Sequence, residues 1–334
     1  MQLSVLDQSP IPEGFTAGDA LRNSVDLAKQ AEALGYGRYW VAEHHAPVGG
    51  TFGFACNSPE VLMGPLAAAT NTIRIGSGGV MLPHYSPLKV SESFHMLAEL
   101  YPNRIDLGIG RAAGTTGKVA HALQRDRRHP PPDDFTEQLD ELLYYIRPNE
   151  PNSPEPALLG SSNQSALWAA ERGLPYVFAD FINPTGESLT ELYRDRFRPS
   201  KFLKKPHVGV AVWAVAADTD EEAFRLSLSV RMAITMLFRG TPIEVPTVER
   251  AEEFVRKEGV PVEMLAAGRR FISGNPANVK AQIEGIAHDY EADEVFLLNI
   301  LHSHSARRHS YDLIAREFGL TMASETESAA LLRS

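Results

Sequence analysis

The chain has 334 residues, of which 43% are hydrophobic and 22% charged, so its composition is that of a folded globular protein and excludes extensive disorder. The length suits two average domains or one (β/α)8 barrel, a fold that runs from roughly 200 to over 400 residues. The net charge of −10 disfavours general binding to nucleic acids or membrane surfaces, and a single cysteine, Cys56, excludes an internal disulfide.

Strand-like and helix-like segments alternate along the first third of the chain, as in parallel βα units. Gly35 provides a C-cap for the first helix. Ser58-Pro59 and Ser86-Pro87 each place a serine at the N-cap and a proline at the first helical position. The expected order is strand 3–6, helix 19–34, strand 38–41, helix 58–70, strand 73–77, helix 87–100 and strand 105–109.

The alternation resumes after a basic stretch over residues 115–132, which we interpret as a loop or short helix over the active face. Asp134 and Glu137 resemble a capping box, and Thr219 with Glu222 predicts the start of a long helix. Residues 240–275 break the repeat and are interpreted as an insertion, with a charged helix around 249–257 and a short extended piece. The expected order is helix 134–145, strand 157–159, helix 162–171, strand 176–179, strand 208–216, helix 219–239, helix 276–290, strand 294–299 and helix 305–318.

Eight strands with intervening helices predict an α/β fold, a single (β/α)8 TIM barrel over residues 1–323 with an insertion before the last strand and a flexible tail at 324–334. Such a barrel gathers the ends of its strands on one face. We therefore expect a possible base, flexible glycines, an arginine and a serine-rich helix start to lie together, as binding a phosphorylated cofactor beside a substrate requires. These strand ends are Glu43-His44-His45, Ser77-Gly78-Gly79, Gly108-Ile109-Gly110-Arg111 and Gly160-Ser161-Ser162.

The segment from Gly160 to Ser165 is typical of a phosphate site. A helix N-terminus offers unpaired N–H groups and the positive end of the helix dipole, and the serine hydroxyls add donors. Arg111 is a possible charge-assisted partner. Without the other strand ends, these residues are equally explained as an ordinary serine N-cap and a solvated arginine.

The run from Gly108 to Ala113 also matches the G-x-G-x-x-A dinucleotide fingerprint. That fingerprint expects an acidic residue about 20 positions later, at the end of the next strand. This chain instead has Arg125-Asp126-Arg127-Arg128 in a region without a strand pattern. A nicotinamide dehydrogenase on a Rossmann domain is therefore weakly supported.

His44 and His45 follow the second strand and could provide a general base, because histidine titrates near neutrality. Adjacent residues on an extended chain point in opposite directions, so only one of them faces the site. A packed structural histidine is the alternative. No third ligand with suitable spacing is nearby, so no metal site is predicted, and His302-x-His304 is interpreted as a solvated loop.

Four segments together resemble the bacterial luciferase-like family of flavin-dependent monooxygenases. Their order and spacing agree with the family from residue 1 to about 180, and more loosely beyond. The segments are residues 39–45 (YWVAEHH), 71–83 (NTIRIGSGGVMLP), 103–111 (NRIDLGIGR) and 162–170 (SNQSALWAA). The resemblance implies a barrel that binds reduced FMN, forms a C4a-peroxyflavin with O2 and oxygenates a small organic substrate, such as an aldehyde or an aromatic or polyketide-like natural product.

The resemblance also implies roles for individual residues. His44 matches the catalytic histidine of the family, and Gly78 with Gly79 its non-prolyl cis peptide against the flavin ring. Gly110 stands where luciferase has a reactive cysteine, which indicates a different pocket and substrate. The implied cofactor-binding residues are Gly78, Gly79, Arg111, Ser161, Ser162 and Ser165.

The implied partners are O2, the organic substrate, an NAD(P)H-dependent flavin reductase that supplies the reduced FMN, and a second copy of the chain, which dimerises through the early helices. Residues 1–7 lack the basic and apolar stretches of a secretory signal, and no run approaches the ~18 apolar residues of a membrane span, so a cytoplasmic protein is expected. Two rivals remain besides the dehydrogenase. They are a deazaflavin (F420)-dependent hydride-transfer oxidoreductase and a non-enzymatic flavin-binding protein.

Overall fold

The predicted (β/α)8 barrel is confirmed. The computed structural model describes residues 1–45, 53–111, 117–124, 126–129, 133–148, 150–259 and 261–321. In these parts of the chain, parallel strands follow the order β6-β5-β4-β3-β2-β1-β9-β7, and pairing of β6 with β7 closes the barrel. The strands are β1 (Gln2–Asp7), β2 (Arg38–Val41), β3 (Arg74–Met81), β4 (Ile105–Gly110), β5 (Glu155–Gly160), β6 (Tyr176–Ala179), β7 (Val208–Ala216), β8 (Ile272–Gly274) and β9 (Glu294–Leu298).

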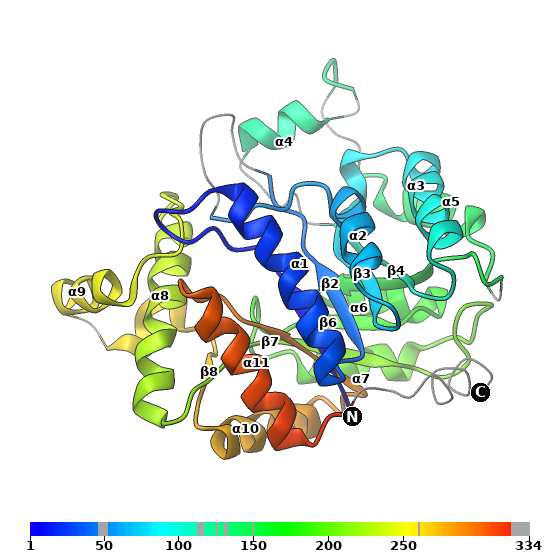
Figure 1. The fold of residues 1–334 in the computed structure, drawn as a ribbon. Helices are drawn as coiled ribbons and strands as arrows, with labels where there is room; N and C mark the ends of the chain where they lie inside the picture. The colour runs from blue at the N-terminus through cyan, green and yellow to red at the C-terminus, as the bar shows by residue number, and fades with distance from the viewer. Residues whose placement is uncertain are drawn as a thin grey trace.

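Helices surround the barrel, and Figure 1 shows α1 and α11 running side by side along its outside. The helices are α1 (Ala17–Leu34), α2 (Pro59–Ala68), α3 (Pro87–Leu100), α4 (Gly117–Leu123), α5 (Phe135–Tyr145), α6 (Asn163–Arg172), α7 (Glu187–Arg196), α8 (Asp220–Phe238), α9 (Val248–Glu258), α10 (Pro276–Asp289) and α11 (His304–Phe318), with 3-10 turns η1 (Leu82–His84) and η2 (Val262–Gly268). No helix within the described residues is both long and apolar enough to cross a membrane.

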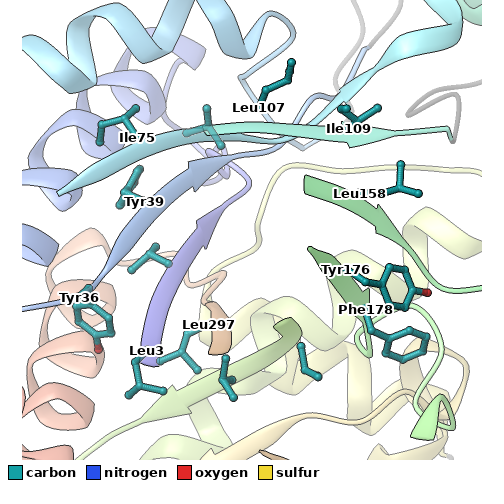
Figure 2. Close-up of a cluster of buried hydrophobic side chains, with 14 of the residues drawn as sticks. Leu3, Tyr36, Tyr39, Ile75, Leu107, Ile109, Leu158, Tyr176, Phe178 and Leu297 are labelled. Atoms are coloured by element: carbon teal, nitrogen blue, oxygen red, sulfur yellow. The ribbon is translucent and has the colours of Figure 1, made fainter. Parts of the chain in front are cut away.

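Alternation along the strands divides the core into two layers. Val210 and Val212 of β7 belong to the large cluster between strands and helices, whereas Ala211 and Trp213 belong to a second cluster. Successive side chains of a strand point to opposite faces, so the second cluster fills the barrel interior. Figure 2 shows part of the outer layer, in which Tyr176 and other labelled side chains lie on the side of the strands facing the helices.

The interpreted insertion at 240–275 contains α9, η2 and the short strand β8. The expected charged helix and extended piece are therefore both present. Strand β8 pairs with β7 through Ala214 and Ile272, outside the closed barrel order. The predicted tail at 324–334 lies outside the described residues.

The predicted N-cap positions of Ser58 and Ser86 at α2 and α3 are confirmed, although neither side chain makes a capping hydrogen bond. Other local predictions were wrong. Asp134 likewise makes no side-chain cap bond to α5, and its carboxylate accepts a bond from Gln138 instead of forming the expected box with Glu137. Helix α7 had no sequence signal because its N-cap is a glycine without a capping side chain and its composition is strongly polar.

Candidate functional site

A cavity of about 530 Å³ lies at the carboxyl-terminal ends of the strands. Residues on or just after β1 to β7 line it, so the chain contributes to it from nearly every βα unit. Active sites of (β/α)8 enzymes occupy this face. All of the sequence-predicted site residues line this one cavity: His44, Gly78, Gly79, Arg111, Ser161, Ser162 and Ser165.

Helix α6 directs its N-terminus at the cavity. Ser162 is its N-cap, and the Ser162 hydroxyl accepts from the Ser165 N–H at 3.3 Å. The Ser165 hydroxyl donates to the Ser162 carbonyl at 2.7 Å and lies 3.0 Å from the Tyr176 hydroxyl. Ser165 is therefore buried and closes the turn, while Ser161 and Ser162 are more exposed toward the cavity. The remaining free N–H groups of the first turn give this end the donor set of an anion site.

Gly160 is required for the shape of this turn. A Cβ atom at position 160 would lie 2.3 Å from the Ser165 hydroxyl oxygen and 2.4 Å from its Cβ. The absence of a side chain lets β5 run directly into the capped helix.

Arg111, the residue after β4, lies beside this helix. Its guanidinium carbon is 5.2 Å from the ring centre of Trp168 on α6, and Nη2 donates to Asp133 Oδ1 at 2.9 Å. The Arg111 side chain is 51% exposed and Asp133 85%. An ion pair this exposed is weak, so the guanidinium can exchange Asp133 for an anion at the helix N-terminus.

The floor of the cavity includes Gly78 and Gly79, which are joined by a cis peptide bond as the family resemblance implied. A Cβ atom at position 79 would lie 2.8 Å from the Gly108 carbonyl oxygen, and one at position 78 would lie 2.3 Å from Leu6 Cδ1. Both glycines therefore allow β3 to approach its neighbours closely at the cavity wall.

His44 follows β2 and faces the cavity. Its backbone N–H donates to the Cys56 carbonyl at 2.9 Å, and its ring packs on Phe54 at a centroid distance of 4.5 Å. Burial, and secondarily the neighbouring His45, lower the pKa of His44 to about 4. The ring is therefore neutral at physiological pH and can accept a proton or a hydrogen bond.

His45 is not among the residues that line the cavity, which confirms the prediction that only one of the two histidines faces it. Its Nε2 lies 2.7 Å from Oε1 of the fully buried Glu43. Glu43 also accepts the Tyr85 hydroxyl at 2.7 Å and the Met81 N–H at 3.0 Å. Burial and the Glu43 carboxylate raise the pKa of Tyr85 well above its usual value. Through these hydrogen bonds Glu43 connects the segment after β2, which contains His44, to the end of β3.

The two sides of the cavity differ in polarity. The side formed by β1 and β2 carries the polar residues Gln8, Glu43 and His44 next to Leu6 and Ala42, whereas the lining residues on the side formed by β6 and β7 are apolar, among them Phe181 and Ala211. Sequence reasoning did not select Gln8, because no motif surrounds it.

The His302-x-His304 pair lies elsewhere. The Nε2 atoms of the two rings lie 3.1 Å from the Glu13 carbonyl oxygen and 2.9 Å from Asp26 Oδ2, respectively, so both histidines are partly buried instead of lying in a solvated loop. Among the described residues, no group of three histidines, cysteines or acidic residues is placed to hold a metal ion.

Known proteins share both the sequence and the architecture. The profile of the family described as luciferase-like monooxygenase matches residues 1–293. The N-acetyl-S-alkylcysteine monooxygenase of Bacillus subtilis is 37% identical over 94% of this chain and 97% of its own length. The crystal structure of apo-MsnO8 has a TM-score of 0.86 and 37% identity, covering 96% of this chain and 99% of that one.

A more distant structure shares the fold alone. It is the oxygenating constituent of 3,6-diketocamphane monooxygenase of Pseudomonas putida in complex with FMN, with a TM-score of 0.70 and 17% identity over 95% of this chain and 98% of that chain. The extended profile match and the close relatives lead to one conclusion. The chain belongs to the luciferase-like monooxygenase family.

Proposed function

We propose that this protein is an FMN-dependent monooxygenase that oxygenates a small organic substrate. The observation that carries the proposal is the cavity itself, which joins a capped helix N-terminus and Arg111 on one side to the neutral His44 on another. An anion site and a proton acceptor around one apolar space are what a phosphorylated redox cofactor and its substrate require.

The residues fit FMN in three respects. The first turn of α6 with Ser161, Ser162 and Arg111 suits a phosphate dianion, and Ser165 supports that turn from behind. The backbone at Gly78 and Gly79 suits a flat ring, because side chains at these positions would collide with β1 and β4. The apolar side chains lining the cavity suit the body of an aromatic ring system.

Reduced FMN, when bound, supplies two electrons that activate O2, so that one oxygen atom enters the substrate and the other leaves as water. The protein's contribution is to bind, orient and exclude solvent. His44 accepts a proton or holds a hydrogen bond at the reacting oxygen, and Glu43 keeps the end of β2 in place for it. Short helix α4 and the 240–275 segment are the candidate lids that keep water out.

A separate NAD(P)H-dependent reductase supplies the reduced FMN, in a reducing cytoplasm. The substrates to be tested are aldehydes, aromatic or polyketide-like compounds, and thioethers. The thioethers are included because the relative from B. subtilis is an N-acetyl-S-alkylcysteine monooxygenase.

A second copy of the chain covers the apolar faces of α2 and α3. Support comes from four exposed apolar side chains on these two helices, namely Val61, Leu88, Met96 and Leu100.

The proposal is tested by anaerobic titration of the protein with reduced FMN and, in competition, with reduced F420. Binding of FMN that F420 does not displace at equal concentration supports the proposal. Preference for F420 would replace it by hydride-transfer chemistry. Failure to bind either flavin would reject a flavin-dependent function altogether.

A further inference from the structure

Gln8 directly follows β1 and is, after Leu6, the second residue from this segment that lines the cavity. Leu6 and Gln8 both line the cavity, as expected for side chains two residues apart on an extended segment. The intervening residue, Asp7, points the opposite way and pairs with Arg307 on α11 at 2.7 Å. The Gln8 side chain is therefore directed into the cavity by the alternation of the strand.

The backbone around Gln8 is held in place on both sides. The Asp7 carboxylate accepts the Ser9 N–H at 2.7 Å, and the Ser9 carbonyl accepts the Ala55 N–H at 2.9 Å. Ser9 itself adopts a left-handed conformation with φ of 48°, and its hydroxyl lies 2.9 Å from that of Ser24. Such a conformation in a non-glycine residue persists only where its surroundings fix it. Gln8 is thus presented by a rigid turn.

The amide oxygen of Gln8 is buried and unsatisfied. The residue is 6% exposed, and Oε1 has no hydrogen-bond partner among the described residues. A buried acceptor without a donor destabilises the folded protein, because the group has lost its hydrogen bonds to water. Oε1 is itself shielded from the cavity, and rotation of the amide about its terminal torsion turns this oxygen toward a donor that a ligand brings.

The polarity of the walls indicates which donor. The isoalloxazine ring has an apolar dimethylbenzene end and a polar pyrimidine end that carries an imide N–H. Apolar residues, among them Phe181 and Ala211, line the β6 and β7 side, whereas the polar side chains of Gln8 and His44 lie just after β1 and β2. The oxygen-reactive carbon of the flavin belongs to the pyrimidine end, so this end must face His44 for the proposed chemistry.

We propose that the Gln8 side-chain amide binds the imide edge of the flavin ring, with Oε1 accepting the imide N–H. This inference rests on the proposed FMN-dependent function and deepens it, because it assigns the residue that sets the orientation of the ring. A neutral amide also offers its N–H2 group to the carbonyl beside the imide, so the contact has two points.

The test compares oxidised FMN with 3-methyl-FMN, in which a methyl group replaces the imide hydrogen. Dissociation constants are measured by flavin fluorescence for the wild type, Gln8→Leu and Gln8→Met. Gln2→Leu makes the same substitution at the other end of β1 and serves as the control. We expect the wild type to bind FMN about 5- to 30-fold more tightly than 3-methyl-FMN, a range typical of one hydrogen bond to a buried acceptor.

Both Gln8 variants should bind FMN more weakly by a similar factor and should not distinguish the two flavins, while Gln2→Leu should behave as the wild type. Equal affinity of the wild type for the two flavins overturns the inference without relying on any variant. Unchanged discrimination in folded Gln8→Leu or Gln8→Met also overturns it. In both cases the proposed function stands, whereas a wild type that binds neither flavin in the oxidised or the reduced state refutes the function and the inference together.

Discussion

Removal of the Arg111 guanidinium should weaken binding of FMN but not of riboflavin, which lacks the phosphate. A charge-assisted hydrogen bond contributes about 1.5–3 kcal/mol. Part of this is offset, because Arg111 must leave Asp133, and an exposed pair of that kind is worth about 0.2–1 kcal/mol. The net loss in Arg111→Ala is therefore about 1–2 kcal/mol, or about 5- to 30-fold in Kd for FMN.

The assay is a fluorescence titration of wild type and Arg111→Ala with FMN and with riboflavin. Arg316→Ala is the matched control, because Arg316 is 76% exposed and ion-paired on its own helix with Asp312 at 2.9 Å. The control should leave both affinities unchanged. An equal loss of affinity for riboflavin, or no loss for FMN in Arg111→Ala, would refute the assignment of the phosphate site.

Three further predictions concern the neutral histidine and the buried carboxylates. His44 stays neutral down to a pH of about 4 in the folded protein but gains a proton below about pH 6.5 in the unfolded chain. The free energy of urea unfolding should therefore fall between pH 7 and 5, and it should fall more in the wild type than in His44→Gln. The same decrease in both proteins would contradict this. Glu43→Gln turns an acceptor of three hydrogen bonds into one that also donates, and should lower the free energy of urea unfolding by about 1–3 kcal/mol; an unchanged midpoint would show that the network is dispensable. Asp7→Asn leaves the buried Arg307 without its counter-charge and should lower the same free energy by about 3–5 kcal/mol; a loss below about 1 kcal/mol would contradict the importance of this pair.

Strand positions were predictable where burial alone determines the pattern. Every residue of β7 is buried, and its apolar run from Val208 to Ala216 gave the correct bounds. Strand β3 extends to Met81, beyond the predicted end at Ser77. Its end was missed because Gly78 and Gly79 have low strand propensity, whereas pairing with β4 resumes at Val80 and Met81.

Helices with few buried residues were harder to predict. Only Leu189, Thr190 and Tyr193 of α7 are buried, so the sequence of this helix shows no clear apolar pattern. Tertiary packing stabilises the helix, for example that of Tyr193 on Tyr176 of β6. The serine–proline pairs predicted the starts of α2 and α3 correctly, because proline suits the first helical position whether or not the serine caps.

The site was largely predictable because a parallel barrel brings strand ends together. Residues as distant in sequence as His44 and Ser162 could therefore be predicted to lie together at one end of the barrel. Gln8 could not be selected from the sequence as a site residue. Its proposed role depends on its burial and on the lack of a partner for Oε1, which the sequence does not reveal. Nor could the sequence reveal that Ser165 directs its hydroxyl into the helix cap.

The reaction of the protein–FMN complex with oxygen tests the proposed monooxygenase function most directly. The wild type is mixed anaerobically with reduced FMN, then with oxygenated buffer, while absorbance is followed in a stopped-flow instrument. An oxygen-activating enzyme should give a long-lived absorption transient, distinct from reduced and oxidised FMN, that free FMN does not show. Reoxidation of the bound flavin with the time course of free FMN and without a transient would contradict an oxygen-activating function.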